Sequence, residues 1–271
     1  NDFLKEANPN MSSVETIQTP ETADYWVKAH NNTYNIYLPF KENLPLTRKI
    51  VGYQNTSVQR LKDYLENIAY WTFLKKLDNP HTSLHPNPPI DIQIFTKQGD
   101  NQDIEVLIKN NQAVFQRTKT PTKRNLENTP TLQVRMCLQN LTSQPYYCAL
   151  LYLSQDFGVI PQILNGSTVE LPPNREVWSL GGQYLSDKQA DYIRDYNWEA
   201  EVHYLKLIAS THSFDVNSLA QKGLPSPEIE PLRIFDKRVF TLPTAPRLED
   251  WTSQLIELKI PNPHYKEQPK I

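Results

Sequence analysis

The sequence is short of glycine, cysteine, net charge and long hydrophobic runs. Among its 271 residues are 7 glycines, and neither a GxGxxG nor a GxxxxGK motif followed by Ser or Thr occurs, which argues against a phosphate-cradling loop. The lack of a long apolar run excludes a membrane-spanning helix. A formal net charge of −2 gives no general attraction for nucleic acid. We therefore expect neither nucleic acid nor a membrane as a partner.

The two cysteines, Cys137 and Cys148, both fall in predicted strands. Burial in a strand desolvates a thiol and raises its pKa, so a Cys-His nucleophile pair is disfavoured. The strand register expected below sets the two thiols opposite each other and would permit a disulfide. A chain of this length needs no disulfide, and two buried free thiols in a cytosolic protein are our expectation.

Other catalytic and metal-binding patterns are also missing. No GxSxG or HExxH motif occurs, and Asp156-Phe157-Gly158 resembles a kinase DFG motif without its glycine loop or HRD segment. His81 and His85 would share a face of a helix, but the surrounding prolines forbid a helix there, which disfavours a metal site. We expect no catalytic residue, no cofactor and no metal site in this chain.

Proline and aromatic residues are plentiful instead. The 22 prolines, 14 tyrosines and 5 tryptophans favour a β-rich fold with proline-containing loops. The most regular stretch is Thr131–Gln155, where apolar and polar residues alternate up to Gln139 and an almost wholly apolar run follows from Tyr146 to Leu153. We interpret the stretch as a hairpin with a loop at Leu141–Gln144, which would set Leu138 opposite Tyr147.

One long helix is predicted before this hairpin. Apolar residues recur every three or four positions from Val58 to Leu74, with Thr56 or Ser57 as the cap and Asp78-Asn79-Pro80 as the end. The helix is expected to cover one face of a sheet. The predicted fold class is therefore α+β, mainly β: an antiparallel β-sandwich-like module with one long N-terminal helix packed on a sheet.

Further strands and turns complete the prediction. We expect a hairpin around His30-Asn31-Asn32, a strand at Ile90–Phe95 and a hairpin that joins Ile104–Ile108 to Ala113–Gln116. Later elements are short strands at Val159–Leu164, Thr168–Leu171 and Glu176–Leu180, a short helix or ordered loop within Asp187–Tyr196, a strand at Val202–Ser210, a helical turn at Val216–Ala220 and a strand at Trp251–Ile260.

The expected organisation has four parts. Residues 1–22 are a disordered lead-in, 23–128 an α+β subdomain with the long helix, 129–260 a β-sandwich-like domain and 261–271 a flexible tail. The basic stretch Arg117–Asn128 has a functional interpretation as a phosphate-contacting or protease-sensitive loop. A solvated loop is favoured, since no aromatic residues are interleaved for base stacking. Because residue 1 is Asn rather than Met, a fragment or processed chain is expected.

Segments along most of the chain share a pattern with one protein family. They are DYLENIAYWTFLKKLDNPHTSL (Asp63–Leu84), DIQIF (Asp91–Phe95), LQVRMCLQNLTSQPYYCALLYLSQDFGVIPQI (Leu132–Ile163), VELPPNREVWSL (Val169–Leu180), YLKLIASTHSFDVNSL (Tyr204–Leu219) and LEDWTSQLIELKI (Leu248–Ile260). Taken in order over residues 23–260, they resemble the non-catalytic C-terminal region of bacterial caspase-family (orthocaspase, C14-like) cysteine proteases.

The resemblance implies an accessory role within a cysteine-type endopeptidase. A catalytic half of this family needs a His followed by Gly and an exposed Cys in a DxCxSG-like or QACRG-like turn, and this sequence has neither. The implied partners are a caspase-like catalytic domain or chain and an upstream activating protease. The implied setting is the bacterial cytoplasm, in stress or antiviral defence signalling, and no catalytic residue is carried over.

Two interpretations from other classes remain open. In the first, the chain is a free-standing protein- or peptide-binding β-module that uses a sheet edge or the aromatic residues Trp178, Tyr184 and Trp198. Exposure of these side chains would favour binding, and burial would return them to the core. In the second, the chain is a hydrolase whose residues come together from distant loops, which no motif supports.

Overall fold

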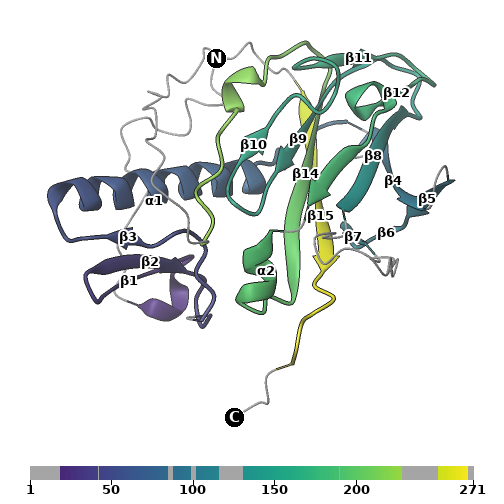
Figure 1. The fold of residues 1–271 in the computed structure, drawn as a ribbon. Coiled ribbons are helices and arrows are strands. Elements are labelled where there is room, and N and C mark those ends of the chain that lie inside the picture. The colour runs from purple at the N-terminus through teal and green to yellow at the C-terminus, as the bar shows by residue number, and fades with distance from the viewer. Residues whose placement is uncertain are drawn as a thin grey trace.

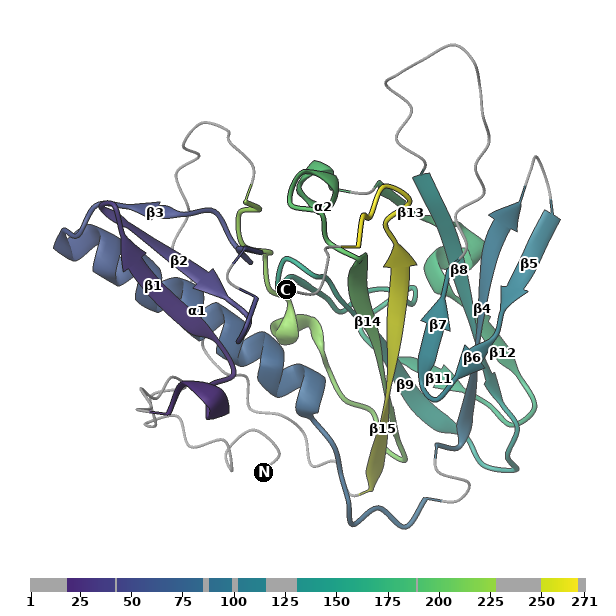
Figure 2. The same ribbon diagram turned by 90° about the horizontal axis from the view of Figure 1, so that it is seen from below.

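The computed structural model describes residues 19–41, 43–84, 88–98, 102–115, 131–188, 190–227 and 250–267. Two large sheets, one small sheet and one long helix make up most of its regular structure (Figure 1), so the expected mainly β, α+β class is confirmed. Seen from below, the small sheet and the helix lie at one end of the molecule and the large sheets at the other (Figure 2). Within the described ranges, no helix is long and apolar enough to cross a membrane.

The small sheet contains the first predicted hairpin. Its order is β1 (Trp26–His30), β2 (Thr33–Tyr37) and β3 (Ile50–Val51). Asn31 and Asn32 join the first two strands with φ of 49° and 58°, the left-handed backbone that asparagine tolerates in tight turns. The hairpin around these two residues is therefore confirmed.

Helix α1 (Asn55–Lys76) follows the small sheet and packs on a large one. Its Trp71 ring lies 5.4 Å from the ring of Phe157 and 5.6 Å from that of Tyr204, both as edge contacts. These rings belong to a buried cluster that joins the helix to both the small sheet and a large sheet. The prediction that the helix covers a sheet is confirmed.

The predicted helix cap is wrong. The helix begins at Asn55, so its N-cap position is Gln54, whose side chain makes no capping hydrogen bond. Ser57 lies inside the first turn, and its buried hydroxyl donates instead to the carbonyl of Val51 at 2.7 Å. This bond satisfies the hydroxyl and ties the helix to the small sheet.

The two large sheets supply the layers beyond the helix. The seven-stranded sheet comprises, in order, β10 (Val159–Ile160), β9 (Tyr146–Leu153), β14 (Ala200–Ser210), β15 (Trp251–Pro261), β7 (Gln112–Val114) and β6 (Ile108–Lys109), with β11 (Val169–Leu171) also paired to β9. The five-stranded sheet comprises β12 (Glu176–Trp178), β8 (Thr131–Asn140), β4 (Ile90–Gln98) and β5 (Gln102–Val106), with β13 (Leu185–Lys188) also paired to β8.

The remaining elements are short. They are helix α2 (Asp191–Asp195) and 3-10 turns at Pro20–Thr22, Ser179–Gly182 and Asn217–Leu219. The short helix near residue 191, the helical turn near 217 and the short strands between 159 and 180 agree with the prediction.

The predicted hairpin over Thr131–Gln155 is wrong, because its two strands lie in different sheets. In strand β8 apolar and polar side chains alternate, which suits a sheet that has one face in the core and the other toward solvent. Strand β9 is apolar on both faces and occupies the middle layer: Cys148 and Leu150 face the five-stranded sheet, and Ala149 and Leu151 face the helix side. Strands β8 and β9 therefore lie in two sheets that pack face to face, and they do not pair with each other.

The expected pairing of residues 104–116 is correct only at its turn. Asn110 and Asn111 have φ of 51° and 57° and connect β6 to β7. The preceding strand β5 instead pairs with β4, so Ile104 and Val106 belong to the five-stranded sheet.

The expected boundary at 128/129 falls outside the described residues, as does the basic stretch 117–128. Strands from both sides of this boundary share sheets, since β4 pairs with β8 and β7 pairs with β15. Residues 1–18 of the expected lead-in are likewise outside the described ranges. The described part of the expected tail is anchored: the Asn262 amide donates to the carbonyls of Ile193 and Trp198, and Lys266 is hydrogen-bonded to Asn197.

Candidate functional site

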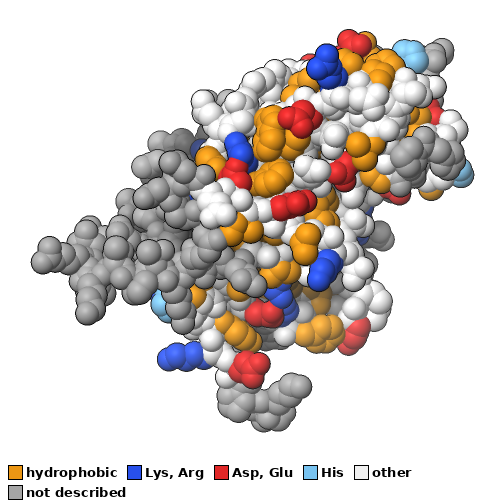
Figure 3. Space-filling model, turned by 90° about the vertical axis from the view of Figure 1, so that its right-hand side faces the viewer, with side chains coloured by type: hydrophobic (Ala, Val, Ile, Leu, Met, Phe, Trp, Pro, Cys, Tyr) orange, Lys and Arg blue, Asp and Glu red, His pale blue; other side chains and the backbone are white. Residues whose placement is uncertain are grey.

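The most developed polar and aromatic group lies on the outward face of the five-stranded sheet. It comprises Phe95, Asp103, Arg135, Trp178 and Tyr184, which we call the Arg135 cluster. Figure 3 faces the side of the molecule that this sheet forms, where hydrophobic, acidic and basic side chains are interspersed.

The period of the strands sets the members of this cluster outward. On β8, Arg135 lies between the buried Val134 and Met136, so its side chain is on the opposite face. Phe95 on β4 is its direct cross-strand partner, and Trp178 on β12 is paired with the next residue but one along β8, Cys137. Asp103 lies on β5, so four strands supply four of the five members, and Tyr184 comes from the segment before β13.

Arg135 holds the cluster together. Its guanidinium carbon lies 4.5 Å from the ring centroid of Trp178 and 5.4 Å from that of Tyr184, within the range of cation–π attraction. The same guanidinium forms an ion pair with Asp103, whose carboxylate also accepts a hydrogen bond from the Tyr184 hydroxyl. Phe95 packs on Trp178 with their centroids 5.4 Å apart. The guanidinium, the carboxylate and the tyrosine hydroxyl are thus held together, while the rings of Trp178 and Tyr184 remain partly exposed.

The three aromatic residues singled out in the sequence have different positions. Trp178 and Tyr184 meet around Arg135, and both are half-buried. Trp198 lies elsewhere, in the turn after α2, where its backbone N–H donates to the carbonyl of Ile193 at 2.9 Å. Its ring is also half-buried, and its indole N–H is buried with no acceptor among the described residues. Trp198 therefore belongs to the packing of the α2 segment.

Sequence reasoning missed Arg135, Asp103 and Phe95. The alternation of β8 was a usable signal, because it sets Arg135 on the polar face. No local signal marks Asp103, since its contact with Arg135 requires β4 to lie between β5 and β8.

The thiols behave as the sequence predicts. Cys137 and Cys148 are both free and both buried. Burial, with the neighbouring Glu176 carboxylate as the next cause, raises the pKa of the Cys137 thiol to about 11. Burial alone raises the pKa of the Cys148 thiol to about 12. The expected opposition of the two thiols across a hairpin is wrong, because their strands do not pair.

One histidine is buried beside a carboxylate. His203 Nε2 lies 3.3 Å from Glu201 Oε1, and both side chains are more than nine-tenths buried. The backbone N–H of Gln155 donates to His203 Nδ1 at 3.2 Å, and the imidazole stacks on Tyr152 with centroids 5.2 Å apart. These contacts tie β9 to β14 and give the pair a structural role.

The other candidate motifs are structural or lie partly outside the described residues. Asp156 and Phe157 form a tight turn, in which Asp156 accepts the N–H of Gly158 at 3.3 Å and Phe157 is buried against α1. His81 is exposed, and His85 lies outside the described ranges. Across the described ranges, no group of three or more His, Cys, Asp or Glu side chains could hold a metal ion.

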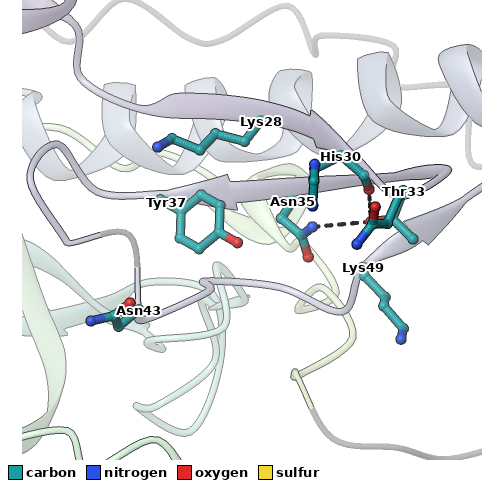
Figure 4. Close-up of a pocket in the computed structure, with 8 residues that line it drawn as sticks. Lys28, His30, Thr33, Asn35, Tyr37, Asn43 and Lys49 are labelled. Carbon is teal, nitrogen blue, oxygen red and sulfur yellow. Dashed lines mark hydrogen bonds between the residues drawn. The ribbon is translucent and has the colours of Figure 1, made fainter.

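A hollow of about 450 Å³ lies at the other end of the molecule, on the small sheet. It is lined by Lys28, His30, Asn31, Thr33, Asn35, Tyr37, Asn43 and Lys49, and we call it the basic hollow (Figure 4). It is open and polar, unlike the enclosed apolar cavities that bind most small cofactors.

Comparison with known proteins adds no identification. No protein-family model matches the chain, and a search of curated proteins gives no match.

Proposed function

We propose that this chain is the non-catalytic, partner-binding portion of a bacterial caspase-like cysteine protease. In this proposal it binds the catalytic domain or chain through the Arg135 cluster and controls activation or substrate access. The single observation that supports this best is the arrangement of Arg135, Trp178 and Tyr184 on an outward sheet face.

The chemistry of the cluster suits a protein interface. Tryptophan, tyrosine and arginine are the residue types that contribute most to binding energy when a partner buries them. Asp103 holds Arg135 and Tyr184 in place before binding, so little side-chain entropy is lost on association. The half-buried rings still have apolar surface to bury against a partner.

The two thiols support an accessory role. A cysteine nucleophile must be a thiolate that its substrate can reach, whereas Cys137 and Cys148 are buried and have raised pKa values. A nucleophile supplied by another segment or chain fits the family resemblance. Activation by an upstream protease, a place in the bacterial cytoplasm and a role in stress or antiviral signalling are part of the same proposal and rest on that resemblance.

A second candidate is a free-standing protein- or peptide-binding module. It is favoured by the completeness of the Arg135 cluster, because all its members come from this chain and none requires a protease domain nearby.

Binding calorimetry tests the proposal. The purified chain is titrated with a caspase-like catalytic domain from the same source genome, and we expect saturable binding. The Trp178→Ala variant should bind at least about tenfold more weakly, as for a central interface aromatic. Leu141→Ala is the matched control, since Leu141 is 60% exposed on the loop between β8 and β9, outside the cluster.

Three results discriminate the proposals. Equal affinity for the Trp178→Ala and Leu141→Ala variants would reject the Arg135 cluster as the interface. Failure of the wild-type chain to bind the catalytic domain, or the lack of any such domain in the source genome, would reject the protease partnership. Saturable, Trp178-dependent binding to a protein unrelated to caspases would establish the second candidate instead.

A further inference from the structure

The basic hollow is built on the solvent face of the small sheet, at the end of the molecule away from the Arg135 cluster (Figures 2 and 4). Its residues come from β1, β2, the turn between them and the loop that connects β2 to β3. None of these residues belongs to the Arg135 cluster, so a ligand bound here would lie outside the proposed protease interface.

Strand register sets two lysines on either side of an amide. Lys28 of β1 is the cross-strand partner of Asn35 of β2. Because Tyr34 pairs with Ile50 in an antiparallel register, Lys49 continues the same row on the far side of Asn35. With strands about 4.8 Å apart, the two lysine backbones are separated by about 10 Å. The row presents an ammonium, an amide and a second ammonium on one face.

The next cross-strand pair on this face, His30 and Thr33, adds an imidazole and a hydroxyl. The Thr33 hydroxyl donates to the His30 carbonyl at 2.8 Å. The Asn35 amide donates to the Thr33 hydroxyl at 3.3 Å, which fixes the orientation of the amide. Figure 4 shows Asn35 and Thr33 in this contact between β1 and the loop that carries Lys49.

The charged side chains that line the hollow among the described residues are basic. Its described lining contains two lysines and a histidine and no carboxylate. Lys49 is exposed, and no described carboxylate forms an ion pair with it. The Lys28 ammonium lies 5.6 Å from the ring centroid of Trp26, which positions it at the edge of the hollow.

Apolar side chains lie close to this polar floor. Phe40 is 70% exposed and packs edge-on against Trp26 with centroids 5.1 Å apart. Val51 is 61% exposed and is the partner of Thr33 on β3. A ligand of the hollow therefore meets cations and amides at its centre and apolar surface beside them.

We propose that the basic hollow binds an acidic peptide segment of a partner protein. Carboxylates two or four residues apart in an extended peptide point to the same side and lie about 7 or 13 Å apart, which brackets the separation of the two lysine backbones. The Asn35 and Asn43 amides can pair with peptide N–H and C=O groups, and Phe40 and Val51 can contact the intervening side chains. A simple anion could also accept hydrogen bonds from the amides but would leave the apolar surface without a role.

Fluorescence anisotropy with the full chain tests this proposal. The probe is a fluorescein-labelled decapeptide in which Glu alternates with Ala, and the control peptide carries Gln at each Glu position. We expect the Glu peptide to bind, the Gln peptide to bind at least about tenfold more weakly, and binding to weaken as salt rises from about 50 to 300 mM.

Variants then assign the binding to the hollow. Lys49→Gln and Lys28→Gln should each weaken binding roughly three- to tenfold. Lys62→Gln is the charge-matched control, because Lys62 is exposed on α1 and pairs with Glu66. An effect of Lys62→Gln equal to that of Lys49→Gln would overturn the assignment, since it would mean that only net charge matters.

Other probes separate the possible ligands. Displacement of the peptide by inorganic phosphate at low millimolar concentration would overturn the peptide proposal in favour of a simple-anion site. Tighter binding of a single-stranded RNA oligonucleotide would overturn it in favour of nucleic acid. Failure here is distinct from failure of the proposed protease partnership, because the Trp178→Ala variant should bind the acidic peptide normally.

Discussion

Asn140 lies at the connection between the two large sheets. Its side chain is fully buried where β8 ends. The amide donates to the carbonyls of Gln144 and Leu171 at 2.7 and 2.9 Å, and its oxygen accepts the backbone N–H and the hydroxyl of Thr142 at 2.9 and 2.8 Å. These four bonds hold the chain as it crosses from one sheet to the other.

We predict that Asn140→Ala lowers the free energy of unfolding by roughly 3–5 kcal/mol. Each lost hydrogen bond costs about 1 kcal/mol net, and a buried polar group that loses its only partner costs more. Because a domain is stabilised by about 5–15 kcal/mol, the variant should lose a large share of its stability.

Urea unfolding followed by tryptophan fluorescence measures this loss. Gln144→Ala is the control, since Gln144 takes part through its backbone carbonyl and its side chain is exposed, and it should cost less than about 0.5 kcal/mol. A cost below about 1 kcal/mol for Asn140→Ala would refute the reasoning, because the connection would then be held by the packing of the strands alone.

Three further predictions concern buried side chains. Burial lowers the pKa of Lys206 to about 8 from the usual 10.5, so between these values the unfolded state holds a proton that the folded state has lost. From pH 8 to 10.5 the wild type should therefore gain stability relative to Lys206→Met, by up to about 1.4 kcal/mol in the free energy of unfolding per pH unit. Curves of unfolding free energy against pH that run parallel for the two proteins would contradict this. At pH 8, a pKa raised from 9.0 to about 11 cuts the thiolate fraction roughly 100-fold, so Cys137 and the still less acidic Cys148 should resist a thiol reagent until urea is added; rapid labelling of the folded chain would disprove their burial. Phe157→Ala should cost roughly 3–5 kcal/mol in the same urea assay, since its buried ring packs on Trp71, and a cost below about 1 kcal/mol would mean that this contact is dispensable.

Lys206 also shows why a charged residue can lie in a core. Its side chain is 3% exposed, and its ammonium donates to the carbonyls of Lys75 and Leu77 at the end of α1. These carbonyls have no partner within the helix, and the helix dipole favours a cation there. Burial destabilises the charged ammonium more than the nearby Asp78 carboxylate stabilises it, which is why the pKa of Lys206 is lowered.

Local signals in the sequence were sufficient for turns and for most elements. Asn31-Asn32 and Asn110-Asn111 specify left-handed turns by themselves, because asparagine tolerates that backbone. The apolar period of α1 likewise predicts the buried face of its second half, where Ile68, Trp71 and Leu74 are all buried, whereas Val58 at the start of the stripe is 48% exposed.

Strand neighbours were not predictable from the same signals. The period of a strand tells which side chains share a face but says nothing about the strand beside it. The run Tyr146–Leu153 is apolar on both faces, which indicates an inner strand, yet its nearness in sequence to Thr131–Asn140 favours a hairpin. The structure resolves this conflict by stacking the two strands in different sheets.

The candidate site was predictable in part for the same reason. Trp178 and Tyr184 stand out by residue type, whereas Arg135 and Asp103 acquire their role from the order of four strands. Trp198 is the same residue type as Trp178, but its surroundings in the α2 segment make it a packing residue.

The measurement that tests the central claim most directly is the peptidase activity of the caspase-like catalytic domain that we propose as the partner, titrated with this chain. We predict that the wild-type chain changes the activity saturably, and that Trp178→Ala needs at least about tenfold more protein for the same change. Peptidase activity of the catalytic domain that is the same with and without the chain, or peptide cleavage by this chain alone, would contradict the account.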